Sequence, residues 1–301
     1  MNKFTGRTAR FGALSAAAVL ALTACGGGDG GGGGDDPEDA DPISLGIIEA
    51  WTDGLSLAYV WQAILEEEGY EVEIDEIADA APLYTAVAQG DYDVYPSAWP
   101  EVTHADYMEE YGDDLEDLGA YYENAKLTFA VPEYTDVDSI EDLNDNADLF
   151  DGQIIGIESG AGLTQITNDS VFPEYDLGEN FELVESSTTA MTSELQQATD
   201  NNEDIVVTLW RPFWANTAFP VKDLEDPKGA LGEAETLNFV ANADFSGEYP
   251  DVAEWMGNFK LSDEEYGELE DLVTVEHEDD PAAGAEQWIE DHRDLVDGIK
   301  E

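Results

Sequence analysis

Short β-branched runs alternate with helical patterns along this chain, and the alternation runs through twice. The first series begins with an expected strand over residues 45–50, and the second begins with one over residues 153–158. An extended stretch over residues 126–131 separates the two series. Strands that alternate with helices favour a sheet covered by helices on its faces. Two such series joined by a crossing segment predict an α/β fold of two lobes with a cleft between them.

The expected elements share apolar runs that glycine, proline or acidic residues terminate. The expected strands are 45–50, 70–77, 92–95, 126–131, 153–158, 181–184, 204–209 and 237–241. The expected helices are 55–68, 82–88, one from 163 onward, 188–199, 251–259, 262–273 and 282–299. The chain would cross out of the first lobe near Pro132 and return near Phe239, which predicts a two-strand hinge. Lobe I would then hold residues 43–133 plus 235–301, and lobe II residues 134–234.

Residues 1–24 are typical of an export signal, because basic residues precede an apolar run too short to span a membrane as a stable helix. This run ends in Leu-Thr-Ala before Cys25, the one cysteine of the sequence. A cysteine in this place resembles a bacterial lipobox, and its lipidation would anchor the protein to a membrane. An ordinary secretory signal with an incidental cysteine is the alternative. Residues 25–42 are otherwise rich in glycine and aspartate, which predicts a flexible tether.

The chain is strongly acidic, with 71 Asp and Glu against 10 Lys and Arg. Nucleic acid is excluded as a partner because its phosphates would be repelled. A hydrophobic content of 43% argues against disorder. We therefore expect a solvated acidic shell suited to a saline setting, with stability that rises with salt. A calcium site is the alternative, but no Asp-x-Asp-x-Asp-Gly loop is present.

Three tryptophans, Trp51, Trp99 and Trp210, each stand where an apolar run has just ended. The carboxyl ends of parallel strands open onto the ligand crevice of an α/β domain. Three indole rings that converge there would form a box suited to a cation without hydrogen-bond donors, such as a quaternary ammonium. The alternative is that each ring fills the core. That is what we expect of most of the other tryptophans, which are Trp61, Trp214, Trp255 and Trp288.

Two further features could hold an anion beside this box. The segment Gly160-Ala-Gly-Leu163 follows an expected strand and opens a helix, so its backbone N–H groups would point outward. His104 lies five residues after Trp99, where a ring N–H could donate to an anion. A plain helix start and a surface or capping histidine are the alternatives. We expect His277 and His292 to be solvated.

Enzyme motifs are missing from the sequence. It contains no Gly-x-Ser-x-Gly elbow, no His-Glu-x-x-His and no Cys-x-x-Cys pair. Carboxylates are so numerous that no pair stands out as acid and base. We therefore expect a binding protein rather than an enzyme, with no cofactor and no metal site.

Several stretches together resemble the substrate-binding lipoproteins of glycine betaine ABC importers, across nearly all of the mature chain. These stretches are Ala50-Trp-Thr-Asp53, Ala80-Ala-Pro-Leu-Tyr-Thr-Ala86, Gln89-Gly-Asp-Tyr-Asp93, Ser97-Ala-Trp-Pro-Glu-Val-Thr-His104, Ile155-Gly-Ile-Glu-Ser-Gly-Ala-Gly-Leu163, Ser186-Ser-Thr-Thr-Ala-Met191, Val206-Val-Thr-Leu-Trp-Arg-Pro-Phe-Trp214 and Leu224-Glu-Asp-Pro-Lys228. The resemblance implies a two-lobe periplasmic-binding-protein-like fold of type II. In members of this family a tryptophan prism surrounds a trimethylammonium group.

The resemblance also implies a role for each matching residue. Trp51, Trp99 and Trp210 would form the prism. The backbone amides of Gly162 and Leu163 and the ring of His104 would hold the carboxylate. One departure is Phe213, which stands where relatives often have histidine, and it bears on the fine shape of the site.

The function implied is capture of glycine betaine, with proline betaine second, for osmoprotection. The partners implied are an ABC permease and its ATPase, with the protein a monomer anchored through Cys25 to the outer face of the cell membrane. A protein that prefers choline or carnitine is one alternative. A lipid-anchored sensor that uses the same cleft without transport is another.

Overall fold

The computed structural model describes residues 41–301. The predicted signal peptide, Cys25 and nearly all of the predicted tether therefore lie outside the described residues. Among the helices of residues 41–301, none has the length and apolar character needed to cross a bilayer.

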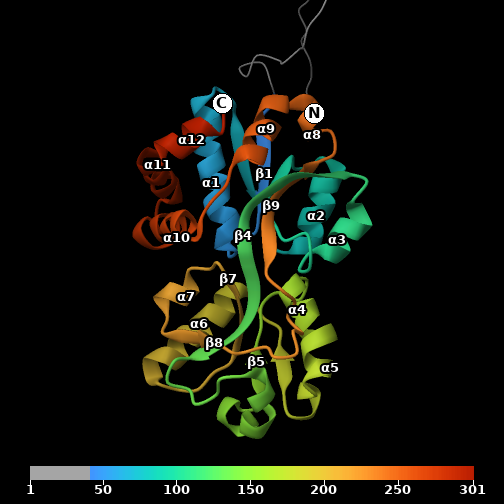
Figure 1. The fold of residues 1–301 in the computed structure, drawn as a ribbon, viewed down its shortest axis with the longest axis vertical. Helices are drawn as coiled ribbons and strands as arrows, with labels where there is room; N and C mark the ends of the chain where they lie inside the picture. The colour runs from blue at the N-terminus through green and yellow to red at the C-terminus, as the bar shows by residue number, and fades with distance from the viewer. Residues whose placement is uncertain (1–40) are drawn as a thin grey trace, which may run out of the picture. The chain divides into compact units, whose positions relative to one another are not determined.

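Strands and helices alternate in both halves of the described chain (Figure 1). The strands are β1 (Ile43–Ile47), β2 (Val72–Glu76), β3 (Val94–Ala98), β4 (Leu115–Pro132), β5 (Gln153–Ile155), β6 (Glu182–Val184), β7 (Val207–Arg211), β8 (Val221–Asp223) and β9 (Glu235–Asn242). The helices are α1 (Thr52–Glu67), α2 (Ala80–Gln89), α3 (Ala105–Tyr111), α4 (Gly162–Ile166), α5 (Phe172–Glu174), α6 (Thr188–Asn201), α7 (Ala215–Ala218), α8 (Phe245–Glu248), α9 (Pro250–Asn258), α10 (Asp263–Asp271), α11 (Pro281–Asp291) and α12 (Arg293–Gly298).

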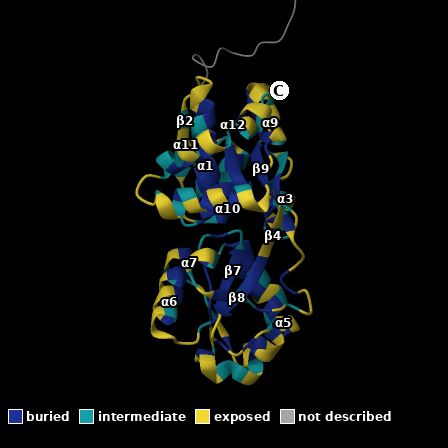
Figure 2. Ribbon diagram, turned by 60° about the vertical axis from the view of Figure 1, so that its left-hand side comes forward, coloured by how far each residue is buried: buried dark blue, intermediate teal, exposed yellow. Residues whose placement is uncertain are grey.

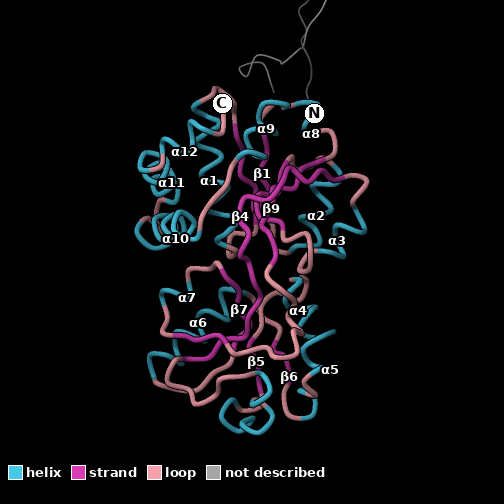
Figure 3. The backbone as a smooth tube through the Cα atoms, in the orientation of Figure 1, coloured by secondary structure: helices cyan, strands magenta, loops and turns pink. Residues whose placement is uncertain are grey.

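The strands form a mixed sheet in the order β2-β1-β3-β9-β4-β7-β5-β6, with β8 paired to β4. On one side β1 runs parallel to β2 and β3, and on the other β5 runs parallel to β6 and β7. The strands β4 and β9 are antiparallel to their neighbours. We call the group β1, β2, β3 and β9 the first lobe and the group β5 to β8 the second lobe. The long strand β4 belongs to both, as the continuous strand trace in Figure 3 shows.

The strand β4 is much longer than the predicted segment 126–131. It pairs with β9 up to Ala125 and with β7 from Lys126 onward. The change of partner, and with it the passage between lobes, lies before the crossing expected near Pro132, whose pairing with β8 already belongs to the second lobe. Residues 115–125 escaped prediction because they are rich in acidic residues and contain Gly119. Their pairing is also irregular, with three register shifts against β9.

The C-terminal segment predicted as one helix over 282–299 is broken. The helix α11 ends before His292, whose φ of −114° and ψ of 30° are not helical, and α12 follows. The imidazole stacks on Trp288 with ring centroids 4.4 Å apart and lies 3.2 Å from a carboxylate oxygen of Glu268. These contacts hold the ring against the protein, so the prediction that His292 is simply solvated was wrong.

The core lies between the sheet and the helices, as the dark blue strands in Figure 2 show. The helix α1 begins with Thr52 and Asp53 and carries one apolar face, on which Leu57, Trp61, Ile64 and Leu65 are fully buried. Burial of such side chains contributes roughly 1.5–3 kcal/mol each. Trp61 was therefore correctly predicted as a core residue.

Candidate functional site

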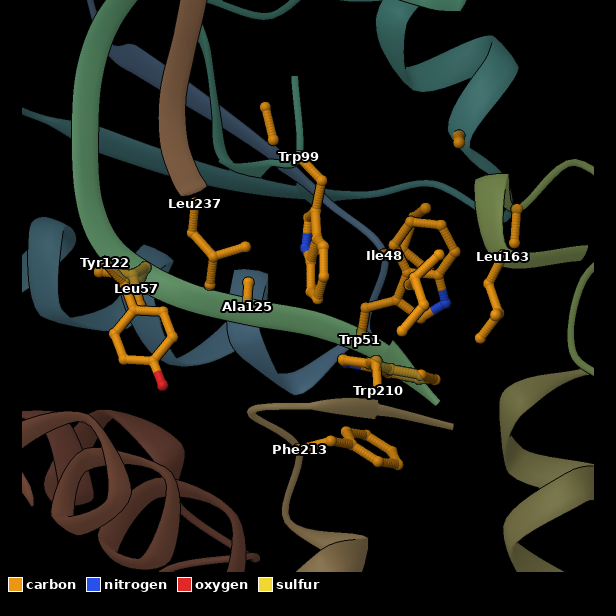
Figure 4. Packing of buried hydrophobic residues seen from close by; sticks show 14 of the residues in the cluster. Ile48, Trp51, Leu57, Trp99, Tyr122, Ala125, Leu163, Trp210, Phe213 and Leu237 are labelled. Atoms are coloured by element: carbon orange, nitrogen blue, oxygen red, sulfur yellow. The ribbon is translucent and has the colours of Figure 1, made fainter. Parts of the chain in front are cut away.

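One pocket collects the carboxyl ends of the parallel strands from both lobes. About 330 Å³ of space in and at the mouth of this pocket is not filled by protein atoms, and part of that space is open to solvent. Its lining is mostly apolar and aromatic: Trp51, Asp53, Trp99, Thr103, His104, Leu127, Ile157, Ala161, Gly162, Leu163 and Trp210. All six side chains and backbone positions predicted to bind ligand are in this set. Figure 4 shows the three indole rings around the same space, with Leu163 nearby.

Trp99 comes directly after β3 and is 4% exposed. Its indole Nε1–H donates to Oδ2 of Asp53 at 3.2 Å, and the Ser97 hydroxyl donates to the same oxygen. The other oxygen of Asp53, Oδ1, is buried without a hydrogen-bond partner among the described residues. Burial raises the pKa of the Asp53 carboxyl, while the Ser97 and Trp99 donors oppose the rise. This contact fixes the plane of one ring of the box.

Trp51 lies between β1 and α1, at the N-cap position of the helix. Its Nε1–H lies 3.2 Å from Oγ1 of Thr188 and 3.3 Å from Oε2 of Glu158. Both acceptors belong to the second lobe, because Glu158 follows β5 and Thr188 opens α6. The indole of the first lobe is therefore held from the second.

Trp210 lies inside β7, where it is paired with Leu127 of β4, and does not follow the end of a strand as predicted. The strand extends through Arg211 because β4 supplies hydrogen-bonding partners up to Lys126. The ring of Phe213 stacks on the Trp210 indole with centroids 4.1 Å apart. Figure 4 shows this pair at one wall of the pocket. Phe213 thus supports the third ring.

His104 is 2% exposed and contacts the first lobe through its Nδ1 atom. This nitrogen accepts the backbone N–H of Trp99 at 3.1 Å and lies 2.9 Å from the hydroxyl of Tyr84. Acceptance at Nδ1 places the proton of the neutral ring on Nε2. Burial lowers the pKa of His104 to about 3, so the ring is neutral at physiological pH. An uncharged N–H donor is thus available at the pocket.

The helical run that begins at Gly162 supplies two further donors. Gly162 and Leu163 are the first two residues of α4, which continues as a π-helical turn over Thr167–Val171. Their backbone N–H groups have no acceptor within the described part of the chain. First-turn N–H groups carry partial positive charge and are suited to an anion.

A buried glutamate holds the loop that carries His104. Glu235, at the start of β9, accepts hydrogen bonds from Val102 N–H at 2.9 Å, from Thr103 N–H at 3.2 Å and from the Thr103 hydroxyl. It is 2% exposed, and burial raises the pKa of its carboxyl. The loop is therefore fixed relative to the hinge strands.

Sequence reasoning assigned no role to several residues of this site. Asp53 and Glu158 stood in the stretches that carried the family resemblance, yet nothing in their spacing indicated that they accept indole N–H groups. Thr188 was expected as a helix start and stood in one of the same stretches, and Leu127 was expected only as part of a strand. The ligand-binding roles of the six predicted residues remain predictions.

The comparisons with known proteins agree with this fold. Residues 41–291 match the family described as the substrate binding domain of ABC-type glycine betaine transport systems. A glycine betaine/carnitine transport binding protein of Listeria monocytogenes is 34% identical over 151 residues, which are 49% of this chain and 50% of that protein. The chain thus aligns with about half the length of this relative.

Two solved structures are similar over most of the chain. Lactococcal OpuAC, in its closed conformation with glycine betaine, is 30% identical and has a TM-score of 0.79. The match covers 87% of this chain and 100% of the OpuAC chain. The glycine/betaine/L-proline-binding protein ProX of Borrelia burgdorferi is 28% identical, has a TM-score of 0.78 and covers 85% and 95%. The predicted two-lobe periplasmic-binding-protein-like fold is therefore confirmed. The chain belongs to the family of substrate-binding domains of ABC-type glycine betaine transport systems.

Proposed function

We propose that this protein captures glycine betaine, or the related proline betaine, between its lobes and delivers it to an ABC permease and its ATPase for osmoprotection. The observation that carries the proposal is the composition of one pocket. Three indole rings lie together with the neutral His104 ring and the free N–H groups of Gly162 and Leu163. A trimethylammonium group suits the rings, and a carboxylate suits the donors.

The expected free energies of these contacts are sufficient for a binding protein that serves transport. Each cation–π contact contributes roughly 0.5–2 kcal/mol. Hydrogen bonds to a charged carboxylate contribute about 1.5–3 kcal/mol each. After the cost of ordering the ligand and closing the lobes, micromolar affinity, near −8 kcal/mol, is a reasonable expectation.

The lobes have separate tasks in this proposal. The first lobe provides Trp51, Trp99 and His104. The second lobe provides Trp210 and the two backbone donors. A ligand that touches both lobes stabilises the closed state, which a permease can distinguish from the open one.

The remaining parts of the proposal concern location and assembly. Lipidation at Cys25, after removal of residues 1–24, would hold the protein at the outer face of the cell membrane as a monomer. Residues 25–42 would act as the tether. Mass spectrometry of the membrane-extracted protein would test the acyl chains on Cys25 directly.

Isothermal titration calorimetry tests the ligand. We would titrate glycine betaine, proline betaine, carnitine and choline at low and at high salt, with Trp99→Ala as the cage-deficient control. Micromolar binding of glycine betaine that the substitution abolishes is the expected result. Stronger binding of choline or carnitine would reassign the ligand, and no binding of any of the four would reject the proposal.

A further inference from the structure

Trp51 is the one ring of the box that a carboxylate of the opposite lobe contacts through the indole N–H. Glu158 Oε2 lies 3.3 Å from the indole nitrogen, and Thr188 Oγ1 lies 3.2 Å from it. The ring itself is 8% exposed and lines the pocket. The N–H edge of the ring therefore contacts the second lobe, while the same ring borders the ligand space.

The carboxylate of Glu158 is also held by Thr188 of its own lobe. Its Oε1 accepts the backbone N–H of Thr188 at 2.8 Å, and its Oε2 accepts the Thr188 hydroxyl at 2.8 Å. Thr188 is 2% exposed and is the first residue of the 14-residue helix α6. The first turn of a helix favours negative charge beside it. The position of the carboxylate is thus set by the second lobe alone.

We propose that Glu158 is a positioning residue that makes Trp51 selective for a cationic ligand, an inference that rests on the proposed function. The Nε1–H group that donates to an anion shifts electron density into the indole, so the π-face turned to the ligand becomes more negative. The same bond holds the ring in one orientation and reduces its rotational freedom. Because the donor and the acceptor come from different lobes, the hydrogen bond that polarises the ring forms when the lobes meet.

Charge and orientation can be separated with a pair of ligands. Glycine betaine and 3,3-dimethylbutanoate have the same shape and the same carboxylate, but the quaternary nitrogen of the first is a neutral carbon in the second. Any change that merely disorders the pocket weakens both ligands. A change in ring polarisation weakens the cationic ligand alone. The ratio of the two affinities is therefore the readout.

The experiment measures this ratio by calorimetry for the unsubstituted protein and for Glu158→Gln, which keeps an acceptor oxygen and removes the charge. The matched control is Glu182→Gln, which removes an exposed charge from the same lobe at the start of β6. We expect Glu158→Gln to lower glycine betaine affinity by about 5–10-fold and to leave 3,3-dimethylbutanoate within about twofold. Glu182→Gln should change neither affinity.

Three outcomes are decisive against the inference. Equal weakening of both ligands in Glu158→Gln would reduce Glu158 to a structural support, and an unchanged ratio with unchanged affinities would remove it from the site. Failure of the unsubstituted protein to bind glycine betaine would reject the proposed function and this inference with it. Should Glu158→Gln not fold, Glu158→Asp can replace it, because this variant retains the charge but withdraws it from the indole. We expect its ratio of affinities to lie between that of the unsubstituted protein and the ratio expected for Glu158→Gln.

Discussion

Gly162 lies directly against the backbone carbonyl of Thr103, so that a Cβ atom at Gly162 would stand 1.9 Å from this oxygen. The two residues belong to different lobes and both line the pocket. Backbone atoms cannot yield as the end of a flexible side chain can. A side chain at position 162 would therefore separate the lobes at the end of the site that we propose holds the carboxylate.

We expect Gly162→Ala to weaken glycine betaine binding by about 10–100-fold, because the closed state becomes less populated. Titration calorimetry measures the loss, and a urea unfolding curve tests that the fold is intact. The matched control is Gly178→Ala, since no heavy atom lies within 4 Å of a Cβ built at Gly178. Equal affinities in Gly162→Ala and Gly178→Ala would contradict this account of the interface.

His104 gives a prediction for the pH dependence of binding. Because burial lowers its pKa to about 3, the ring stays neutral from pH 8 down to pH 5 and donates from Nε2 throughout. We expect glycine betaine affinity to be constant over this range. Titrations at three pH values check it. An affinity that rises on acidification through pH 6.5 would show that the imidazolium, not the neutral ring, binds the carboxylate.

Substitution of His104 tests whether its ring binds the carboxylate of the ligand. Under the proposed function, His104→Ala removes one hydrogen bond to the ligand carboxylate, which is worth about 1.5–3 kcal/mol, and we expect a loss of roughly 10–100-fold for glycine betaine. Choline has no carboxylate, so its affinity should not change. A parallel loss for choline would mean that the ring acts only by supporting Trp51, against which it stacks with centroids 6.1 Å apart.

The sequence allowed the alternation of strands and helices to be predicted because most strands are short apolar runs with clear boundaries. It did not allow β4 to be predicted at full length. Residues Leu115–Ala125 form a strand only because β9 pairs with them across the lobe, and acidic residues and Gly119 obscure the pattern. The break at His292 was missed for the same kind of reason, since its contacts with Trp288 and Glu268 are tertiary.

The pocket could be predicted in part because ligand sites of α/β folds lie at the carboxyl ends of parallel strands. The ends of β1 and β3 bring Trp51 and Trp99 together, and parallel strands make that convergence general. The contact of Trp51 with Glu158 joins residues 107 positions apart. That of Val102 with Glu235 joins residues 133 positions apart. Such contacts depend on how the lobes and the hinge strands meet, which no local pattern encodes.

Phe213, which stands where relatives often have histidine, gives a prediction for both stability and ligand affinity. Phe213→Ala would leave a cavity behind Trp210 and lower the free energy of unfolding by about 3–5 kcal/mol. We also expect weaker glycine betaine binding, since the indole loses the ring stacked on it. Phe150→Ala is the control, because Phe150 is similarly buried, at 5% against 4%, and packs on Phe181 away from the pocket. If both variants lose stability but neither loses affinity, Phe213 does not support the site.

Glu270 gives a prediction for stability against pH. Its carboxylate accepts hydrogen bonds from the hydroxyls of Thr52 at 2.8 Å and Ser56 at 3.1 Å, and the side chain is buried beneath α1. Burial, with a smaller contribution from the nearby Asp53, raises its pKa from 4.5 to about 7. The folded state therefore holds a proton that the unfolded state releases near pH 4.5. Stability from this group is lost as the pH rises from about 4.5 through 7.

Glu270→Gln removes this titration and keeps an acceptor for the two hydroxyls. We expect the variant to match the unsubstituted protein near pH 5 and to exceed its free energy of unfolding at pH 8, by about 3 kcal/mol at most. Urea unfolding at pH 5, 6, 7 and 8 measures the difference between the two proteins. Taking the difference cancels His104, whose lowered pKa acts in the opposite direction below pH 6.5. A difference that does not change between pH 5 and 8 would show that Glu270 is ionised throughout in the folded protein, with the Thr52 and Ser56 hydroxyls outweighing its burial.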